Sequence, residues 1–223
     1  MIHRGQDPYL TTRHVRCKGK RRLRIKSAAL AWMVWPLLLY IEGCSSGPNG
    51  MVTPTTAFDI ASNRTSVFVG ASIIQWWPLP VHNAGIFGQT TTQMLERFKA
   101  DVLGHGYARV IILGGVNDVL QQGSDPPVQI TTNLKSMASI ARGAGLDVIL
   151  ISLPPLTYNG ADLNASVSRA NAGIQQLAAD QGYVFVDIFT PMHGHKEYFI
   201  DGIHPNALGY SIMERSLAAL VNK

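Results

Sequence analysis

The stretch ASNRTSVFVGASIIQWWP, residues 61–78, joins a strand-like run to a short turn that carries one serine. β-Branched and aromatic residues fill the run from Ser66 to Val69, and a Gly-Ala-Ser corner follows it. A run of this composition that ends on small residues is typical of a buried strand. We therefore expect Ser72 at the end of a strand, either as an ordinary turn residue or as a nucleophile held at the edge of a sheet.

Beyond this strand, short apolar runs alternate with longer segments of helical periodicity. The further strand-like runs are LPVHNAG (79–85), ARVIILGG (108–115), DVILISLP (147–154) and YVFVDIF (183–189). The helix-like segments are Thr90–Leu103, Ile130–Ala144, Ser166–Asp180 and Gly209–Val221. This alternation predicts a three-layer α/β/α fold with a five-stranded parallel sheet in the flavodoxin-like order 2-1-3-4-5. Ligands of such sheets bind beyond the carboxyl ends of the strands, which is where Ser72 falls.

The basic character of the chain is confined to its N-terminal part. Residues 1–26 carry nine Lys or Arg and one acid, whereas from Cys44 onward ten Lys or Arg stand against twelve Asp or Glu. The formal net charge of +5 over 223 residues is therefore a property of the tail. Because no Lys/Arg stripe remains in the body of the chain, we expect no nucleic-acid partner.

That tail has the features of a targeting segment. The apolar run AALAWMVWPLLLYI (28–41) has fourteen residues, shorter than the about 20 that a spanning helix needs. The following IEGCSSG resembles a bacterial lipoprotein cleavage box, in which Cys44 becomes the lipidated first residue; the alternative is an uncleaved anchor. We expect a signal peptide or anchor over 1–43, a tether over 44–65 and one domain over 66–223. Either reading places the domain outside the cytoplasm, tethered to the bacterial cell envelope at the periplasmic or outer surface.

Four motifs follow the predicted strands in order: GASI (70–73), NAGIFGQTT (83–91), GGVND (114–118) and DGIHPN (201–206). Together they resemble the SGNH, or GDSL-type, hydrolase family of esterases and lipases. The likeness runs from Val67 to about Met213, and its specificity lies in the joint occurrence of the motifs. The resemblance implies a serine ester hydrolase that needs no cofactor and no metal.

The resemblance also assigns roles to five residues. It makes Ser72 the nucleophile, His204 its base and Asp201 the carboxylate that orients the base, and it makes Ser72, Gly88 and Asn117 the oxyanion-hole donors. These residue types suit the chemistry, because a serine hydroxyl is a weak nucleophile until an imidazole removes its proton. The tetrahedral intermediate then needs hydrogen-bond donors aimed at its negative charge. Each residue alone would more often be a turn, cap or loop residue.

Other residues complete the interpretation. Ala71 stands where the family usually has an aspartate that helps to hold the nucleophile turn. Trp76 and Trp77 are candidates for the substrate-binding surface, as stacking surfaces for a sugar ring, although one of them is expected in the core. His193 and His195 lack partners at metal-ligand spacing and are interpreted as loop residues.

The expected substrate is a short acyl ester, such as an acetyl ester, of a carbohydrate or small molecule. Three alternatives remain open. The first is a lysophospholipase or thioesterase acting on long acyl chains, and the second is acyl transfer to a sugar by the same residues. The third is a non-catalytic lipoprotein that binds glycan. The sequence does not determine the oligomeric state.

Overall fold

The structure is a computed structural model that describes residues 65–79, 81–121 and 126–221. All of these residues belong to one compact unit, which runs from Met51 to Lys223. In the described ranges, no helix is both long enough and apolar enough to cross a bilayer.

The N-terminal predictions fall on a part of the chain that the structure does not describe. The expected signal peptide or anchor (1–43), the lipidation site Cys44 and all of the tether except Thr65 lie outside the described residues. The cleavage, the lipid and the envelope location therefore stay predictions.

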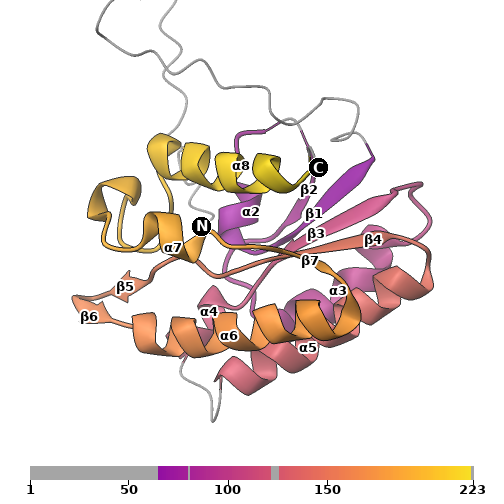
Figure 1. The fold of residues 1–223 in the computed structure, drawn as a ribbon, viewed down its shortest axis with the longest axis horizontal. Helices are drawn as coiled ribbons and strands as arrows, with labels where there is room; N and C mark the ends of the chain where they lie inside the picture. Colours follow the sequence, from indigo (N-terminus) through magenta and orange to yellow (C-terminus); the bar gives the residue numbers. More distant parts are fainter. Residues whose placement is uncertain (1–64, 80, 122–125, 222–223) are drawn as a thin grey trace, which may run out of the picture. The chain divides into compact units, whose positions relative to one another are not determined.

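Five parallel strands form one sheet in the order β2-β1-β3-β4-β7, as Figure 1 shows. The bounds are Ser66–Gly70 for β1, His82–Gly85 for β2, Arg109–Leu113 for β3, Asp147–Ile151 for β4 and Val184–Val186 for β7. Numbered among themselves along the chain, these strands have the order 2-1-3-4-5, so the predicted flavodoxin-like fold is confirmed. Every residue of β1 is buried, as expected of a strand covered on both faces.

Helices cover both faces of this sheet. In Figure 1, α3, α5 and α6 lie on one side of the strands, and α2 and α8 lie on the other. The helices are α2 Ser72–Gln75, α3 Thr91–Val102, α4 Val116–Gln121, α5 Pro126–Gly143, α6 Asn164–Gln181, α7 Phe189–Met192 and α8 Ala207–Val221, with a 3₁₀ turn η1 at Lys196–Tyr198. The apolar faces of the long helices and the strands form one core.

The ends of the helices follow local chemistry. Thr90 caps α3 through a reciprocal capping box with Gln93, and Gly182 ends α6 in a left-handed conformation with φ 65°. α5 begins at Pro126, four residues before the predicted start at Ile130. Proline is tolerated in the first helical turn because no N–H is needed there, and this turn carries too few apolar residues to be seen in the periodicity.

The sequence pattern did not predict the short helices α2, α4 and α7, the turn η1 or a small hairpin. Thr157–Tyr158 (β5) and Ala161–Asp162 (β6) form a small antiparallel hairpin that stands apart from the main sheet. Its turn is Asn159-Gly160, and both residues have positive φ, at 49° and 79°. Strands of two residues show no periodicity, but the Asn-Gly dipeptide is a recognised hairpin signal that could have located it.

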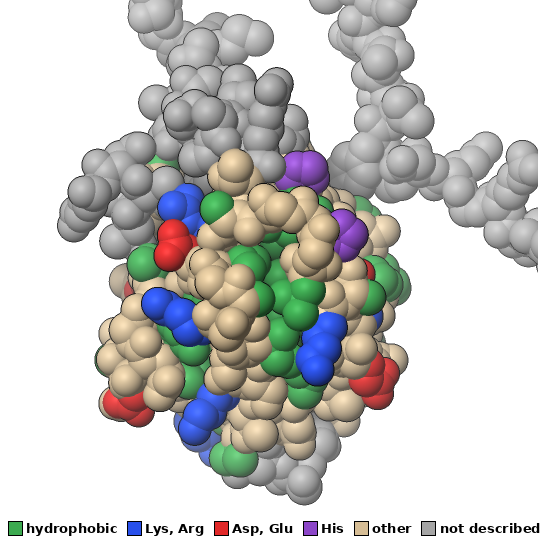
Figure 2. Space-filling model, turned by 90° about the vertical axis from the view of Figure 1, so that its right-hand side faces the viewer, with side chains coloured by type: hydrophobic (Ala, Val, Ile, Leu, Met, Phe, Trp, Pro, Cys, Tyr) green, Lys and Arg blue, Asp and Glu red, His purple; other side chains and the backbone are tan. Residues whose placement is uncertain are grey.

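The face in Figure 2 carries charges of both signs. Lys and Arg side chains lie singly on it, with Asp and Glu side chains between them and hydrophobic side chains exposed in the middle. The described part of this face therefore presents a mixed surface rather than a continuous patch of one sign.

β2 approaches the main chain of α2 closely at Gly85. A Cβ at this position would lie 2.6 Å from the Cα of Gln75 and would overlap its main chain. We therefore expect Gly85→Ala to destabilise the fold by about 1–3 kcal/mol, the usual cost of overpacking. Thermal unfolding measures the change.

Gly143, at the end of α5, is the matched control. A Cβ there meets nothing within 4 Å, so Gly143→Ala should be neutral or up to about 1 kcal/mol stabilising. Equal unfolding temperatures for Gly85→Ala and Gly143→Ala would contradict the close packing of β2 on α2.

Candidate active site

Ser72 lies where β1, an inner strand of the sheet, ends and a helix begins. β1 ends at Gly70, and Ser72 is the first residue of α2, with 6% of its surface exposed. The main-chain N–H of a first helical residue has no partner within the helix. The turn thus presents at the carboxyl edge of the sheet a hydroxyl and an N–H that has no acceptor among the described residues.

A chain of hydrogen bonds joins Ser72 to two residues near the end of the chain. Ser72 Oγ lies 3.0 Å from His204 Nε2, across 132 residues of sequence. On the other side of the ring, His204 Nδ1 lies 2.7 Å from Asp201 Oδ2. An ionised carboxylate can only accept, so Nδ1 carries the hydrogen and Nε2 is left to accept from the serine hydroxyl.

Asp201 is held as an ionised acceptor. Burial by itself raises the pKa of the Asp201 carboxyl. Hydrogen bonds from the His204 N–H, the His204 ring and the Ile203 N–H outweigh this effect and hold the pKa below its ordinary value. The two main-chain bonds to Oδ1 measure 2.8 Å from His204 and 3.0 Å from Ile203. The carboxylate therefore remains charged over the whole neutral range.

The hairpin β5–β6 supports the loop that carries Asp201 and His204. The Thr157 N–H donates to the carbonyl of Gly202 at 3.0 Å, and the Ile200 N–H donates to the carbonyl of His204 at 2.8 Å. Gly202 has φ 82°, and a Cβ there would lie 2.6 Å from the Thr157 carbonyl oxygen. Glycine is required at this position by both its conformation and its neighbour.

Gly88 lies in the loop between β2 and α3, and Asn117 is the second residue of α4, which follows β3 at the same edge of the sheet. Asn117 Nδ2 donates to the carbonyl of Gln89 at 2.9 Å, which places the amide beside Gly88; no other described residue accepts from its second N–H. Gly88 has φ 77°, and among the described residues its own N–H has no hydrogen-bond partner. The N–H groups of Ser72, Gly88 and Asn117 are thus all available to an external acceptor.

A buried polar cluster behind Asn117 was not found from the sequence. Asp118, 8% exposed, accepts from the Thr91 N–H at 2.9 Å and from the Thr91 hydroxyl at 2.5 Å. Asn133 Nδ2 in turn donates to the Thr91 hydroxyl at 2.9 Å. A buried carboxylate is costly unless it is hydrogen-bonded, and here it joins the start of α4 to the start of α3. Asp118 alone resembles a helix-start residue, so only the long-range contact reveals its role.

The two adjacent tryptophans have different surroundings. Trp76 is 38% exposed, and its ring centroid lies 4.6 Å from that of His204 and 5.6 Å from that of Phe87. Trp77 is 3% exposed and packs between Phe68 and Tyr210. One of the two tryptophans was expected in the core, and it is Trp77; of the pair, Trp76 faces the site, and its role in substrate binding stays a prediction.

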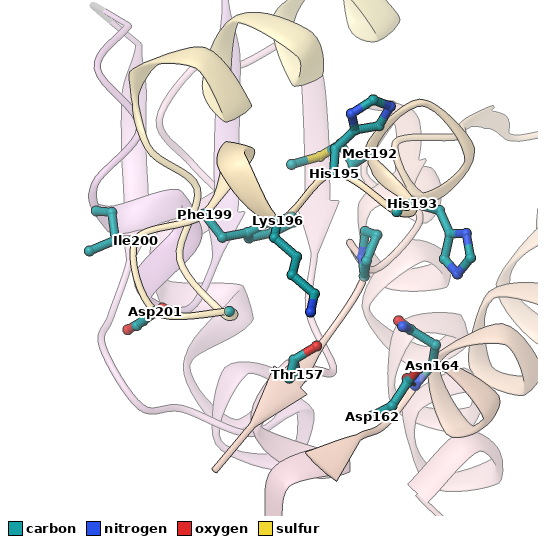
Figure 3. A pocket seen from close by; sticks show the side chains of 13 residues that line it. Thr157, Asp162, Asn164, Met192, His193, His195, Lys196, Phe199, Ile200 and Asp201 are labelled. Carbon is teal, nitrogen blue, oxygen red and sulfur yellow. Dashed lines mark hydrogen bonds between the residues drawn. The ribbon is translucent and has the colours of Figure 1, made fainter. Parts of the chain in front are cut away.

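A cavity of about 480 Å³ adjoins the Asp201 loop, and Figure 3 shows it. The Lys196 side chain reaches across it toward Thr157. The polar residues that line the cavity also include Asp162, Asn164, His193 and His195. His195 pairs with Glu197 at 2.7 Å, and the described residues contain no group of three metal-ligating side chains.

Comparisons with known proteins agree on one family. The family model of the GDSL-like lipase/acylhydrolase family matches residues 49–212. The crystal structure of a GDSL-like lipase from Bacteroides thetaiotaomicron is 30% identical, with a TM-score of 0.66 over 73% of this chain and 89% of that one. A Bacteroides fragilis protein is 29% identical, with a TM-score of 0.64 over 74% and 88%.

An acetylxylan esterase from Geobacillus stearothermophilus, in a catalytic mutant form, is 19% identical and shares the fold, with a TM-score of 0.59 over 69% of this chain and 92% of that one. A search of curated proteins found no match.

The lowered pKa of Asp201 predicts a pH-dependent contribution to stability. A carboxyl whose pKa is lower in the folded state stabilises the fold above its unfolded value of about 3.9, and this contribution is lost as the pH falls through the folded-state pKa. Asp201→Asn should therefore lower the unfolding temperature at pH 7, and the difference from wild type should shrink in strong acid.

Asp180→Asn on the exposed face of α6 serves as the control and should change the unfolding temperature little at either pH. An equal loss for Asp201→Asn at both pH values would show that the ionised carboxylate is not the stabilising species.

Proposed function

The chain belongs to the GDSL-like lipase/acylhydrolase family of carboxylic ester hydrolases, and we propose that Ser72, His204 and Asp201 are its catalytic triad. The observation that carries this proposal is the 3.0 Å contact between Ser72 Oγ and His204 Nε2, with Asp201 on the far side of the ring. A serine that only begins a helix does not need an imidazole within hydrogen-bond distance of its hydroxyl. Here the imidazole comes from a loop 132 residues away and is oriented by a carboxylate.

In the acylation step, Ser72 Oγ attacks the carbonyl carbon of the ester while His204 Nε2 takes the hydroxyl proton. Asp201 holds the ring in the correct tautomer and stabilises the imidazolium that forms. The tetrahedral intermediate then collapses, and the imidazolium gives its proton to the departing alcohol. The product of this step is an acyl ester on Ser72.

The free N–H groups of Ser72, Gly88 and Asn117 are the proposed oxyanion hole. They would donate hydrogen bonds to the carbonyl oxygen and stabilise the negative charge that develops on it in both steps. In the second step, water attacks the acyl-enzyme while His204 removes its proton, and the carboxylic acid leaves with Ser72 restored. No step requires a cofactor, because the triad supplies the nucleophile and the base, and the main chain supplies most of the charge stabilisation.

We propose short acyl esters of a carbohydrate as the substrate class. Trp76 offers an exposed ring beside His204 on which a sugar can stack. The cavity next to Asp201 has Lys196, Thr157 and Asn164 in its lining, and these side chains can form hydrogen bonds with the hydroxyl groups of a sugar. An acetylxylan esterase shares the fold, and an acetylated sugar polymer is a substrate of this class.

The alternative is a long acyl chain, as in a lysophospholipase or thioesterase. Phe87 and Ile200, at 60% and 57% exposed, provide apolar surface near the site. This surface is open to solvent, whereas a long chain gains about 0.8 kcal/mol per CH₂ only when it is buried. The open arrangement therefore favours the short acyl group.

The triad is tested by removing the nucleophile. Ser72→Ala and His204→Ala should each abolish nearly all hydrolysis of p-nitrophenyl acetate, because members of a triad act as a unit. A fluorophosphonate probe should label the wild-type protein at Ser72 and leave Ser72→Ala unlabelled. Circular dichroism confirms that the variants are folded, and a Ser72→Ala protein with wild-type turnover would overturn the assignment.

The substrate class is tested with p-nitrophenyl esters of increasing acyl length. We expect kcat/KM to be highest for acetyl or propionyl esters and to fall toward octanoyl and longer esters. Trp76→Ala should weaken the hydrolysis of an acetylated xylo-oligosaccharide more than that of p-nitrophenyl acetate, because only the former brings a sugar ring.

A steady rise of kcat/KM toward the longest acyl chains would instead establish the long-chain alternative.

A further inference from the structure

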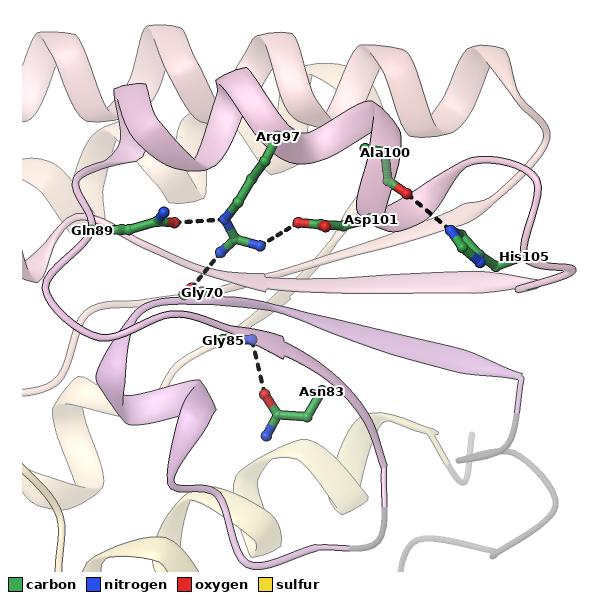
Figure 4. Close-up of polar contacts among 8 residues, drawn as sticks. All are labelled: Gly70, Asn83, Gly85, Gln89, Arg97, Ala100, Asp101 and His105. Atoms are coloured by element: carbon green, nitrogen blue, oxygen red, sulfur yellow. Dashed lines mark hydrogen bonds and ion pairs between the residues drawn. The ribbon is translucent and has the colours of Figure 1, made fainter. Parts of the chain in front are cut away.

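The side chain of Arg97, on α3, binds three separate acceptors (Figure 4). Its Nε donates to the Gln89 side-chain oxygen at 2.6 Å, and its Nη2 donates to the carbonyl of Gly70 at 2.9 Å. Its Nη1 pairs with Asp101, one helical turn further along α3. Only 16% of the Arg97 side chain is exposed, so the guanidinium is held in one position.

Two of these acceptors adjoin the groups proposed for the oxyanion hole. Gly70 is the last residue of β1 and lies two positions before Ser72. Gln89 directly follows Gly88, and its carbonyl accepts the hydrogen bond from the Asn117 side chain at 2.9 Å. A single guanidinium therefore reaches the nucleophile turn directly and the Gly88 and Asn117 segments through Gln89.

The alanine at position 71 makes the hydrogen bond from Arg97 to the nucleophile turn more important. An alanine has no polar side chain with which to hold the nucleophile turn, so hydrogen bonds onto it must come from other elements. The Tyr210 hydroxyl donates to the carbonyl of Ile73 at 2.9 Å, and Asn83 Nδ2 donates to the carbonyl of Ile74 at 2.6 Å. Both of these bonds hold α2 after Ser72. Arg97 binds the turn on its other side, before Ser72.

We infer that Arg97 is a positioning residue that fixes the spacing of the Ser72, Gly88 and Asn117 donors; this inference rests on the proposed function. Arginine suits this position because its planar guanidinium presents several donors in fixed directions, whereas a lysine ammonium on a flexible stem cannot hold two acceptors at one geometry. Arg97 does not touch the reacting atoms and acts only through the segments it holds.

The inference predicts a particular kinetic signature. Oxyanion donors act mainly on the transition state, so a shift of the donors lowers kcat and leaves KM nearly unchanged. A displacement of about 1 Å caused by a distant mutation can cost about 10²-fold in rate. We therefore expect Arg97→Ala to lower kcat on p-nitrophenyl acetate by about 10- to 100-fold, with KM within about twofold of wild type.

Asp101→Asn is the matched control. It removes the ion pair within α3 but leaves the bonds from Arg97 to Gly70 and Gln89 in place, so kcat should stay within about twofold of wild type. If Arg97 served only to stabilise α3, the two variants would lose activity alike. Arg97→Lys, which keeps the charge and the bulk, should fall between wild type and Arg97→Ala and covers the case in which Arg97→Ala does not fold.

A rescue experiment separates positioning from general stability. Millimolar guanidinium chloride, far below denaturing concentrations, should raise kcat of Arg97→Ala several-fold by occupying the vacated position. It should not raise kcat of Asn117→Ala, in which the donor itself is missing. Wild-type kcat for folded Arg97→Ala or Arg97→Lys would overturn the inference while Ser72→Ala remained inactive. Activity retained by Ser72→Ala would overturn the proposed function and this inference together.

Discussion

The parallel register of β1 against its two neighbours is the constraint on which the site depends. Gly70, the last residue of β1, pairs with Gly85 of β2 on one side and with Leu113 of β3 on the other. Because parallel strands that are paired at their last residues also end together, the three following loops emerge at the same edge. The segments that follow the three strands carry Ser72 at the start of α2, Gly88 in a loop, and Asn117 at the start of α4. A shift of one residue in either pairing would move one of these groups away from the others.

Small residues and buried hydrogen bonds turn this shared edge into a defined arrangement. Gly85 lets β2 approach the main chain of α2, and Gly70 leaves room for Ile74 of the same helix. The Asp118–Thr91 contacts and the Arg97 contacts then join α3 and α4 to the loops on this edge. A buried polar group destabilises the fold unless it is hydrogen-bonded. Each hydrogen bond in this network therefore also restricts the conformations that the loops can adopt.

The fourth loop reaches the site in a different way. Asp201 and His204 do not follow a strand of the sheet but lie in a turn that is closed on itself, with Asp201 accepting from the main chain of Ile203 and His204. The hairpin β5–β6 holds this turn through Gly202. The conformation of the turn therefore depends on its own hydrogen bonds and on the hairpin. The turn meets the nucleophile segment through the 3.0 Å contact between His204 and Ser72 and through the packing of the His204 ring on Trp76.

The amino-acid sequence by itself determined the alternation of strands and helices, the order of the sheet, and the presence of Asp201 and His204 three residues apart on one turn. The alternation and the turn depend on periodicity, on glycine and on hydrogen bonds between near neighbours, which a local stretch of sequence expresses directly, and the order of the sheet was predicted from the alternation along the whole chain. It did not reveal that Trp76 faces the site while Trp77 enters the core, nor that Arg97 and Asp118 lie behind the donors. Those positions depend on which segments, distant in the sequence, pack against one another, and the packing of the whole domain decides this.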